Sequence, residues 1–100
     1  MRVISKRALL EFTHREPRAR QTFLAWYRIV KGAEWQKPTD IRADFRSADF
    51  VAGNRVIFDI GGNKYRLVAE INYRRQCVFI RFVGTHVEYD AIDAATVKRY

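Results

Sequence analysis

The stretch from Gly61 to Asp90, GGNKYRLVAEINYRRQCVFIRFVGTHVEYD, decides the predicted fold. Apolar and polar residues alternate along it, as they do in strands with one buried face, and we predict two strands, at 63–73 and 76–83. The two glycines at its start both accept positive φ and suit a tight hairpin turn. The preceding RVIFDI, residues 55–60, is therefore predicted to be a third strand, and the three strands form an antiparallel meander.

The N-terminal third has the periodicity of helices. Residues 6–15 and 18–31 carry apolar side chains at spacings of three and four, which is typical of helices with one buried face. Pro17 suits a first helical turn, because its missing N–H would have no partner there. Residues 2–4 are predicted to be a short first strand and residues 91–100 a polar tail. The chain is thus predicted to be one α+β domain, 1–100, with two helices packed on one face of the sheet.

The composition indicates an anionic partner. The chain has 19 basic and 11 acidic residues, a formal net charge of +8. Arginine outnumbers lysine 14 to 5, and the planar guanidinium binds two phosphate oxygens at once, which an ammonium cannot do. Nucleic acid or an acidic protein is therefore the predicted partner, and the alternative is that the charge serves solubility alone.

Other classes of protein are disfavoured by what the sequence lacks. A single cysteine, Cys77, allows no internal disulfide, and the spacing of cysteine and histidine spells out no metal site. No apolar run approaches the roughly 20 residues that a membrane span needs, and the N-terminus does not resemble a signal peptide. We expect a cytoplasmic protein.

The predicted strand register separates two faces of the sheet. With two-residue turns, Ile57 lies opposite Arg66, which faces Val83, and Val68 faces Arg81. Because side chains alternate along a strand, the face covered by the helices collects Val56, Phe58, Ile60, Tyr65, Leu67, Ala69, Ile71, Val78, Ile80 and Phe82. Arg66 and Arg81 then fall on the other face as near neighbours, where they bind an anion or, alternatively, are neutralised by Glu70 or Asp59.

Two motifs in this stretch resemble the HigB toxin family, part of the RelE/ParE group of bacterial toxin–antitoxin proteins. They are Gly62-Asn63-x-x-Arg66-Leu67 and Gly84-Thr85-His86-x-x-Tyr89-Asp90. The opening MRVISKRALLEF and the segment AWYRIVKGAEW are also similar to HigB toxins. The resemblance therefore covers nearly the whole chain.

The resemblance implies a RelE/ParE-like compact domain and an activity. The activity is that of a ribosome-dependent endoribonuclease, an mRNA interferase without a cofactor, which cleaves messenger RNA in the decoding site of the 30S subunit. It also implies a HigA antitoxin as partner, with a helix-turn-helix domain. Operator DNA is then bound only through the complex with the antitoxin, and no membrane is involved.

The same resemblance points to residues for the chemistry. Cleavage by the RNA 2′-hydroxyl needs a base, cations around the phosphate and an acid for the leaving oxygen. His86 is the predicted base, because an imidazole exchanges protons near neutral pH, and Tyr89 is predicted to donate a proton or to stack on a nucleobase. Arg66 and Arg81 are predicted to hold the phosphate, with Lys64 assisting. His86 as an ordinary turn residue and Tyr89 as a lid on the core remain alternatives.

Further side chains are predicted to bind RNA through salt-sensitive phosphate contacts; they are Asn63, Arg55, Arg74, Arg75, Arg18 and Arg20.

Two other functions remain open from the sequence. One is a toxin of the same fold that inhibits DNA gyrase without cleaving RNA, as ParE-like toxins do. The other is a basic RNA-binding module without catalytic activity.

Overall fold

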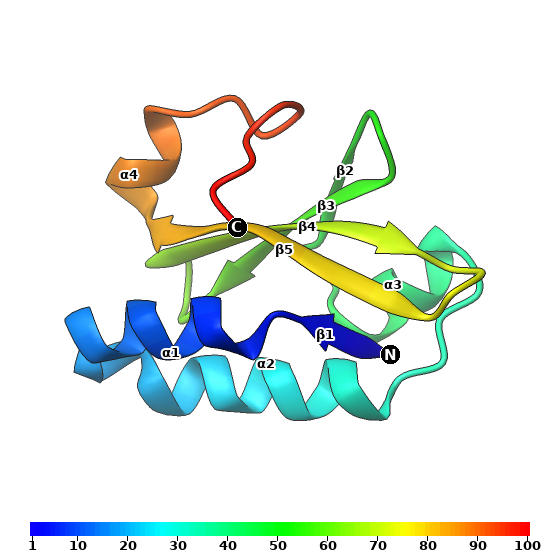
Figure 1. Cartoon of the computed structure of the whole chain (residues 1–100), viewed down its shortest axis with the longest axis horizontal. Coiled ribbons are helices and arrows are strands. Elements are labelled where there is room, and N and C mark those ends of the chain that lie inside the picture. Colours follow the sequence, from blue (N-terminus) through cyan, green and yellow to red (C-terminus); the bar gives the residue numbers. More distant parts are fainter.

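A five-stranded mixed sheet forms the middle layer of the computed structural model, which describes residues 1–100 (Figure 1). The strands lie in the order β1-β5-β4-β3-β2. β1 is parallel to β5, and the remaining neighbours are antiparallel. Their bounds are β1 (Arg2–Ile4), β2 (Asp49–Val51), β3 (Arg55–Ile60), β4 (Tyr65–Asn72) and β5 (Cys77–Thr85). The α+β class and the meander are confirmed, whereas the edge strand β2 was not predicted.

Two helices cover one face of this sheet, as predicted. The helix α1 (Lys6–Arg15) has the predicted bounds. The helix α2 (Arg20–Gly32) follows a single 3-10 turn, η1 (Pro17–Ala19), so that it begins two residues later than expected. Both lie below the sheet in Figure 1, and they bury Leu9, Phe12, Phe23, Trp26 and Val30 against it. A third, short helix, α3 (Pro38–Asp44), buries Ile41 before the chain enters β2.

The first hairpin departs from the predicted register, because its turn has four residues rather than two. Gly61, Gly62 and Asn63 have φ values of 69°, 61° and 77°, and Ile60 pairs with Tyr65. Residue 66 consequently lies opposite Asp59 and not, as predicted, opposite Ile57. Since the register moves by two residues, every side chain keeps its predicted face.

A β-bulge in β5 overturns part of the predicted face assignment. The predicted register holds from the β4–β5 turn as far as Ala69 and Ile80, but Val68 then pairs with Phe82. Arg81 is the extra residue of the bulge. From this point each residue of β5 is displaced by one position, so the predicted pairing of Val68 with Arg81 is wrong.

The bulge also moves one aromatic and one aliphatic side chain of β5 to the opposite faces of the sheet. Phe82 was predicted to face the helices, yet it lies in a second cluster on the opposite face, and Val83 takes its place in the main core. Arg66 therefore lies opposite Gly84 and not opposite Val83. A one-residue displacement reverses the face of every following side chain, because the period of a strand is two.

The second face of the sheet is covered by the last part of the chain. The short helix α4 (His86–Asp90) is followed by residues 91–100, which we call the C-terminal strap and which lie on the side opposite α1 and α2 (Figure 1). The strap is not the predicted polar tail, because its apolar side chains pack on the second cluster. The residues in contact are Ile57, Val68 and Phe82 from the sheet and Tyr89, Ile92, Ala94 and Val97 from the covering segment.

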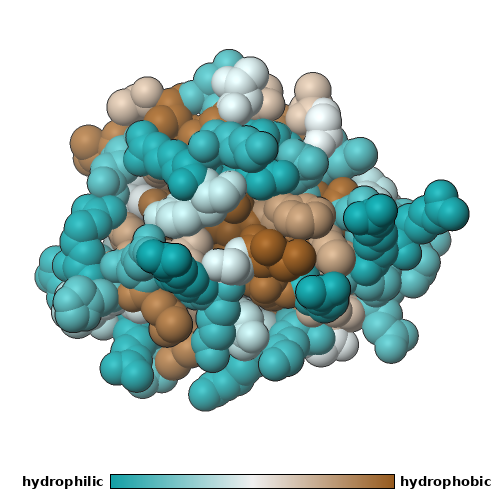
Figure 2. All heavy atoms as spheres, in the orientation of Figure 1, coloured by the Kyte–Doolittle hydropathy of each residue, from teal (hydrophilic) through white to brown (hydrophobic).

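The charged residues lie mostly at the surface of this three-layered molecule. Figure 2 shows hydrophilic side chains over most of one face, with hydrophobic side chains gathered near its middle. No helix of the chain is long and apolar enough to cross a membrane.

Candidate active site

The helix α4 is fixed to the end of the sheet by a capping box. The Thr85 hydroxyl accepts a hydrogen bond from the Glu88 backbone N–H at 3.2 Å, and the Glu88 carboxylate accepts one from the Thr85 N–H at 2.9 Å. Arg15 of α1 adds an ion pair with the same carboxylate at 3.1 Å. The backbone N–H of His86 donates to the Lys64 carbonyl at 3.0 Å, which ties the first residue of α4 to the β3–β4 turn.

This arrangement also accounts for the charge state of the capping carboxylate. The hydrogen bond from the Thr85 backbone lowers the pKa of Glu88, and Arg15 lowers it further, while partial burial acts in the opposite direction. Glu88 is therefore ionised at neutral pH and keeps both partners.

Gly84 is required immediately before α4 because the backbone and the Phe82 ring approach each other there. A Cβ atom at this position would lie 2.5 Å from a ring carbon of Phe82 and 3.2 Å from the Cβ of Glu88. Any side chain at residue 84 would therefore displace the ring or the helix.

Arg66 is held on the outer face, close to α4, by groups of the turn and of β3. Its Nε lies 2.9 Å from the Asp59 carboxylate, and its Nη1 donates to the carbonyls of Asn63 and Tyr65 at 3.2 and 3.3 Å. The residue is only 9% exposed. The hydrogen bonds of Arg66 within the chain come from Nη1, so Nη2 is the terminal nitrogen left for a ligand.

Tyr89 lies between this guanidinium and the second cluster. The Arg66 guanidinium carbon is 5.6 Å from the centre of the Tyr89 ring, and the centres of the Tyr89 and Phe82 rings are 6.3 Å apart. Burial raises the pKa of the Tyr89 phenol, which Arg66 partly offsets, and the carboxylates of Asp49, Asp59 and Asp90 raise it further. The phenol is therefore a neutral proton donor across the physiological pH range.

His86 is on the same helix, three residues before Tyr89, so the two side chains share a face. It is exposed, and its Nδ1 lies 3.3 Å from the Asp90 carboxylate. A carboxylate at one ring nitrogen holds a proton there and leaves the other nitrogen, here Nε2, as an acceptor. Lys64 is exposed in the adjoining turn and pairs with no carboxylate.

The candidate site consists of Lys64, Arg66, His86 and Tyr89, and comparison with known proteins identifies the family of the chain. Residues 19–92 match the family model of the HigB toxin, described as the RelE-like toxic component of a toxin–antitoxin system. The chain belongs to the HigB toxin family. An antitoxin is therefore its partner, since family members are one component of a two-protein system.

Relatives that match over most of their length carry the same family name. The chain is 30% identical to the mRNA interferase HigB of Escherichia coli O6:H1, strain CFT073, over 92% of this chain and 91% of that protein. It is also 30% identical to the mRNA interferase toxin HigB of Escherichia coli K12 and to the mRNA interferase HigB of Shigella flexneri, in each case over 94% of this chain and 92% of the relative.

In this HigB-family chain the structure separates Arg81 from Arg66. Both lie on the outer face, but Arg81 is three residues along β5 from Gly84, the partner of Arg66, roughly 10 Å at 3.3 Å per residue. The Val68 and Phe82 side chains lie between them. The predicted face of both arginines is thus retained, but the bulge removes the predicted pairing of Arg81 with Val68, and the two guanidiniums contact different carboxylates.

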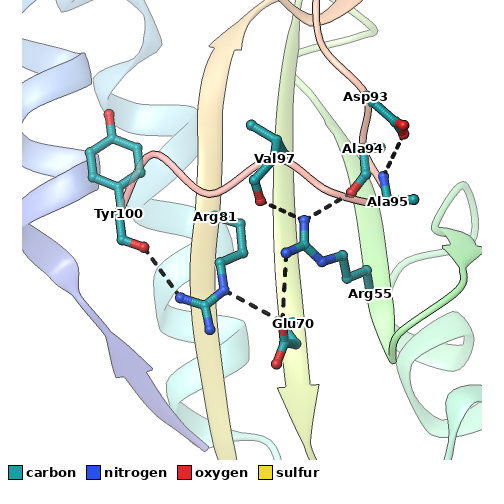
Figure 3. A network of polar contacts seen from close by, with 8 residues as sticks. All are labelled: Arg55, Glu70, Arg81, Asp93, Ala94, Ala95, Val97 and Tyr100. Atoms are coloured by element: carbon teal, nitrogen blue, oxygen red, sulfur yellow. Dashed lines mark hydrogen bonds and ion pairs between the residues drawn. The ribbon is translucent and has the colours of Figure 1, made fainter.

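The alternative in which carboxylates neutralise the arginines describes what is observed. Arg66 pairs with Asp59, as noted, and Glu70 lies 3.5 Å from Arg81 and 3.7 Å from Arg55 (Figure 3). Arg81 also donates to the Tyr100 carbonyl at 3.2 Å. The side chains of Arg55 and Arg81 thus hold the C-terminal strap in the isolated chain.

Arg55 is the stronger of these two clamps. Its Nη1 donates to the carbonyls of Ala94 and Val97 at 3.0 and 2.6 Å, and the residue is only 8% exposed (Figure 3). A buried guanidinium with three internal partners is poorly placed for the RNA contact predicted from the sequence.

The other residues predicted to bind RNA are dispersed. Arg74 and Arg75 lie in the β4–β5 turn, at the opposite end of the strands from α4. Arg20 lines shallow pockets between α1 and α2, whereas Arg18 lines a pocket next to the β3–β4 turn. Asn63 is in that turn and offers its carbonyl to Arg66.

Among three acidic residues of the site, Glu88 and Asp90 were assigned no role from the sequence, and Asp59 was named only as an alternative partner of the arginines. The capping function of Glu88 has a readable signal, since Thr85-His86-Val87-Glu88 fits the capping-box pattern. Asp90 lies four residues after His86, which is contact spacing on a helix. Asp59 had no such signal, because its pairing with residue 66 depends on the length of the turn.

Proposed function

We propose that this chain is an mRNA interferase, a toxin that cleaves messenger RNA by attack of a ribose 2′-hydroxyl on the adjacent phosphate. The observation that supports the proposal is the position of α4, whose first residue donates its backbone N–H to the Lys64 carbonyl and whose Tyr89 ring centre lies 5.6 Å from the Arg66 guanidinium carbon. The names of the relatives support the same activity.

The roles follow from which atoms are free. The Nε2 of His86 takes the proton of the 2′-hydroxyl, with Asp90 holding the proton on Nδ1. The Nη2 of Arg66 and the ammonium of Lys64 stabilise charge on the phosphorane. Tyr89, whose pKa is raised by burial, donates a proton to the departing 5′-oxygen.

The proposal extends to the setting in which the chain acts. Messages are cut while they are translated, in the decoding site of the 30S subunit, and a HigA-type helix-turn-helix antitoxin neutralises the toxin in the cytoplasm. The formal charge of +8 favours association with ribosomal RNA. A single rigid guanidinium and a flexible lysine also suit an enzyme whose substrate is positioned by the ribosome.

Induced expression of the chain in cells without an antitoxin tests the proposal. We expect growth arrest and cleavage of messages within their coding regions, mapped by sequencing of RNA 5′ ends, and no cleavage of the same messages when initiation is blocked. Intact messages during growth arrest, with a DNA-damage response, would contradict the proposal and favour gyrase inhibition.

Two variants connect the cleavage to the site. Because His86 is exposed, His86→Ala should leave the fold intact and lower cleavage about 10²–10⁴-fold, as for loss of a positioned base. Arg66→Lys keeps a cation beside Asp59 but loses the open N–H edge. Arg28→Gln, on the exposed surface of α2, is the matched control. Cleavage at the unmodified rate by both site variants would exclude these residues from the mechanism.

A further inference from the structure

An open pocket of about 270 Å³ lies between the start of α2 and the β3–β4 turn. Its lining consists of Arg18, Thr22, Gly61, Lys64 and Tyr65. The pocket is distinct from the cluster around Arg66, because Tyr65 and Arg66 point to opposite faces of β4. Only Lys64 belongs to both, since its carbonyl accepts a hydrogen bond from α4 and the residue also lines the pocket.

The polar side chains of this pocket are free to bind a ligand. The hydroxyls of Thr22 and Tyr65 have no hydrogen-bond partner in the chain and are not enclosed. Thr13 shows the contrast, since its hydroxyl bonds back to the Leu9 carbonyl at 2.8 Å, as helical threonines commonly do. The ammonium of Lys64 pairs with no carboxylate, as noted above.

The lining of the pocket also includes a second cation, Arg18, and the packed ring of Tyr65. Arg18 has one contact, 3.4 Å from Glu16, and its side chain is 90% exposed. The Tyr65 ring packs against Phe12 and Phe23, with ring centres 5.8 and 5.7 Å away. No acidic residue lines the pocket, so an anion meets two cations and two hydroxyl donors without a repelling group.

The size of the pocket indicates the kind of anion. Its volume is just below the roughly 300–1,000 Å³ of small-molecule sites, which suits a phosphate with part of its sugar. Gly61 keeps this space open, because a Cβ there would lie 3.0 and 3.2 Å from carbons of the Tyr65 ring and 3.8 Å from the Thr22 methyl. Arginine, lysine and hydroxyl side chains are the usual partners of nucleic-acid phosphates.

We propose that this pocket is a subsite for an RNA backbone phosphate, next to the one at which the chain cleaves. The inference rests on the proposed ribonuclease function and extends it. An RNA strand that crosses the β3–β4 turn would place one phosphate near Arg66 and another in the pocket, with Lys64 between them.

Binding measurements with an uncleavable probe test this subsite. The probe is a trinucleotide with 2′-O-methyl riboses, titrated against the intact chain and followed by NMR amide shifts. We expect shifts at Gly61 and Thr22. Arg18→Gln should weaken binding about tenfold, the lower end for a charge-assisted hydrogen bond, and Thr22→Val about threefold. Arg28→Gln removes one charge from α2, outside the pocket, and should leave binding unchanged.

Salt dependence separates the two kinds of contact. In Arg18→Gln the slope of log affinity against log salt should become less steep by about 0.7, the value for one phosphate on a single strand. In Thr22→Val the slope should not change. Message-free ribosomes are the second ligand. If the pocket variants lose ribosome binding alone, the phosphate belongs to ribosomal RNA. If they lose trinucleotide binding, the phosphate belongs to the message.

The proposal is overturned if neither ligand distinguishes Arg18→Gln and Thr22→Val from Arg28→Gln, or if the amides of Gly61 and Thr22 do not respond. Cleavage is measured separately on the same variants. Normal cleavage by a chain whose pocket variants bind like the control refutes the subsite alone. Pocket-dependent binding by a chain that never cleaves messages refutes the proposed function and leaves the subsite in place.

Discussion

The C-terminal strap is expected to depend mainly on the guanidinium of Arg55, and Arg55→Met tests this. The substitution keeps the length and apolar character of the side chain but removes its two hydrogen bonds to Ala94 and Val97. Hydrogen bonds to charged groups contribute about 1.5–3 kcal/mol each. Because the strap can move into solvent and its carbonyls can then bind water, we expect a net loss of about 2–3 kcal/mol.

A shortened chain separates the contribution of these two hydrogen bonds to the free energy of unfolding from other effects of the substitution. A chain that ends at Asp93 lacks both carbonyls, so Arg55 retains only its 3.7 Å contact with Glu70, which is 38% exposed. Such a partly exposed pair contributes roughly 0–1 kcal/mol. Arg55→Met should therefore cost less than about 1 kcal/mol in the shortened chain, and the double-mutant cycle should give a coupling energy of at least about 1 kcal/mol.

Urea denaturation followed by circular dichroism measures all four free energies of unfolding. In the full chain the loss corresponds to a decrease in Tm of roughly 8–24 °C for a domain of this size. Arg28→Met on the exposed face of α2 is the control and should change stability by less than about 0.5 kcal/mol. An equal cost of Arg55→Met in the full and the shortened chain would show that the clamp contributes nothing, and the reasoning would be wrong.

Two further predictions concern α4. Glu88→Gln should destabilise the chain by roughly 0.3–1.5 kcal/mol at neutral pH. Because folding lowers the pKa of Glu88, the contribution of its carboxylate to stability is present above the ordinary value of 4.5 and is lost as pH falls through the folded-state pKa. The unfolding curves of the two proteins should therefore converge in acid. Tyr89→Phe keeps the ring beneath Arg66 and removes only the hydroxyl, so stability should change little while single-turnover cleavage slows about 10²–10⁴-fold; an unchanged rate would assign Tyr89 to stacking alone. Since the pKa of Tyr89 is raised above 10.0, its ionisation should not lower the rate of the unmodified enzyme below that pH.

The elements that could be predicted from the sequence are those set by local periodicity. The bounds of α1 and β3 agree with the prediction, because α1 buries one regular face and β3 is a short run of mostly buried residues. The turn after β3 could not be predicted, since Gly61-Gly62 fits a two-residue turn as well as the observed four-residue turn, in which Asn63 also has positive φ. β2 is only three residues long and carries no alternation from which it could be recognised.

The candidate site was predictable only in part, for a related reason. His86 and Tyr89 come together through the helical spacing of α4, which the sequence carries. The environment of Arg66 depends instead on two non-local features, the length of one turn and the bulge at Arg81. A bulge has no sequence signal of its own here, because Ile80, Arg81 and Phe82 fit an uninterrupted strand equally well.

The bulge gives the two arginines different functions. Without it, residue 82 would face α1 and α2, and Val83 would replace Phe82 in the cluster on which Tyr89 and the strap pack. With it, Phe82 supports Tyr89 from below, and Tyr89 in turn lies against Arg66. The same displacement leaves Arg81 beside Glu70 and the chain terminus. One inserted residue thus builds the support of the candidate site at one end of the face and fixes the strap at the other.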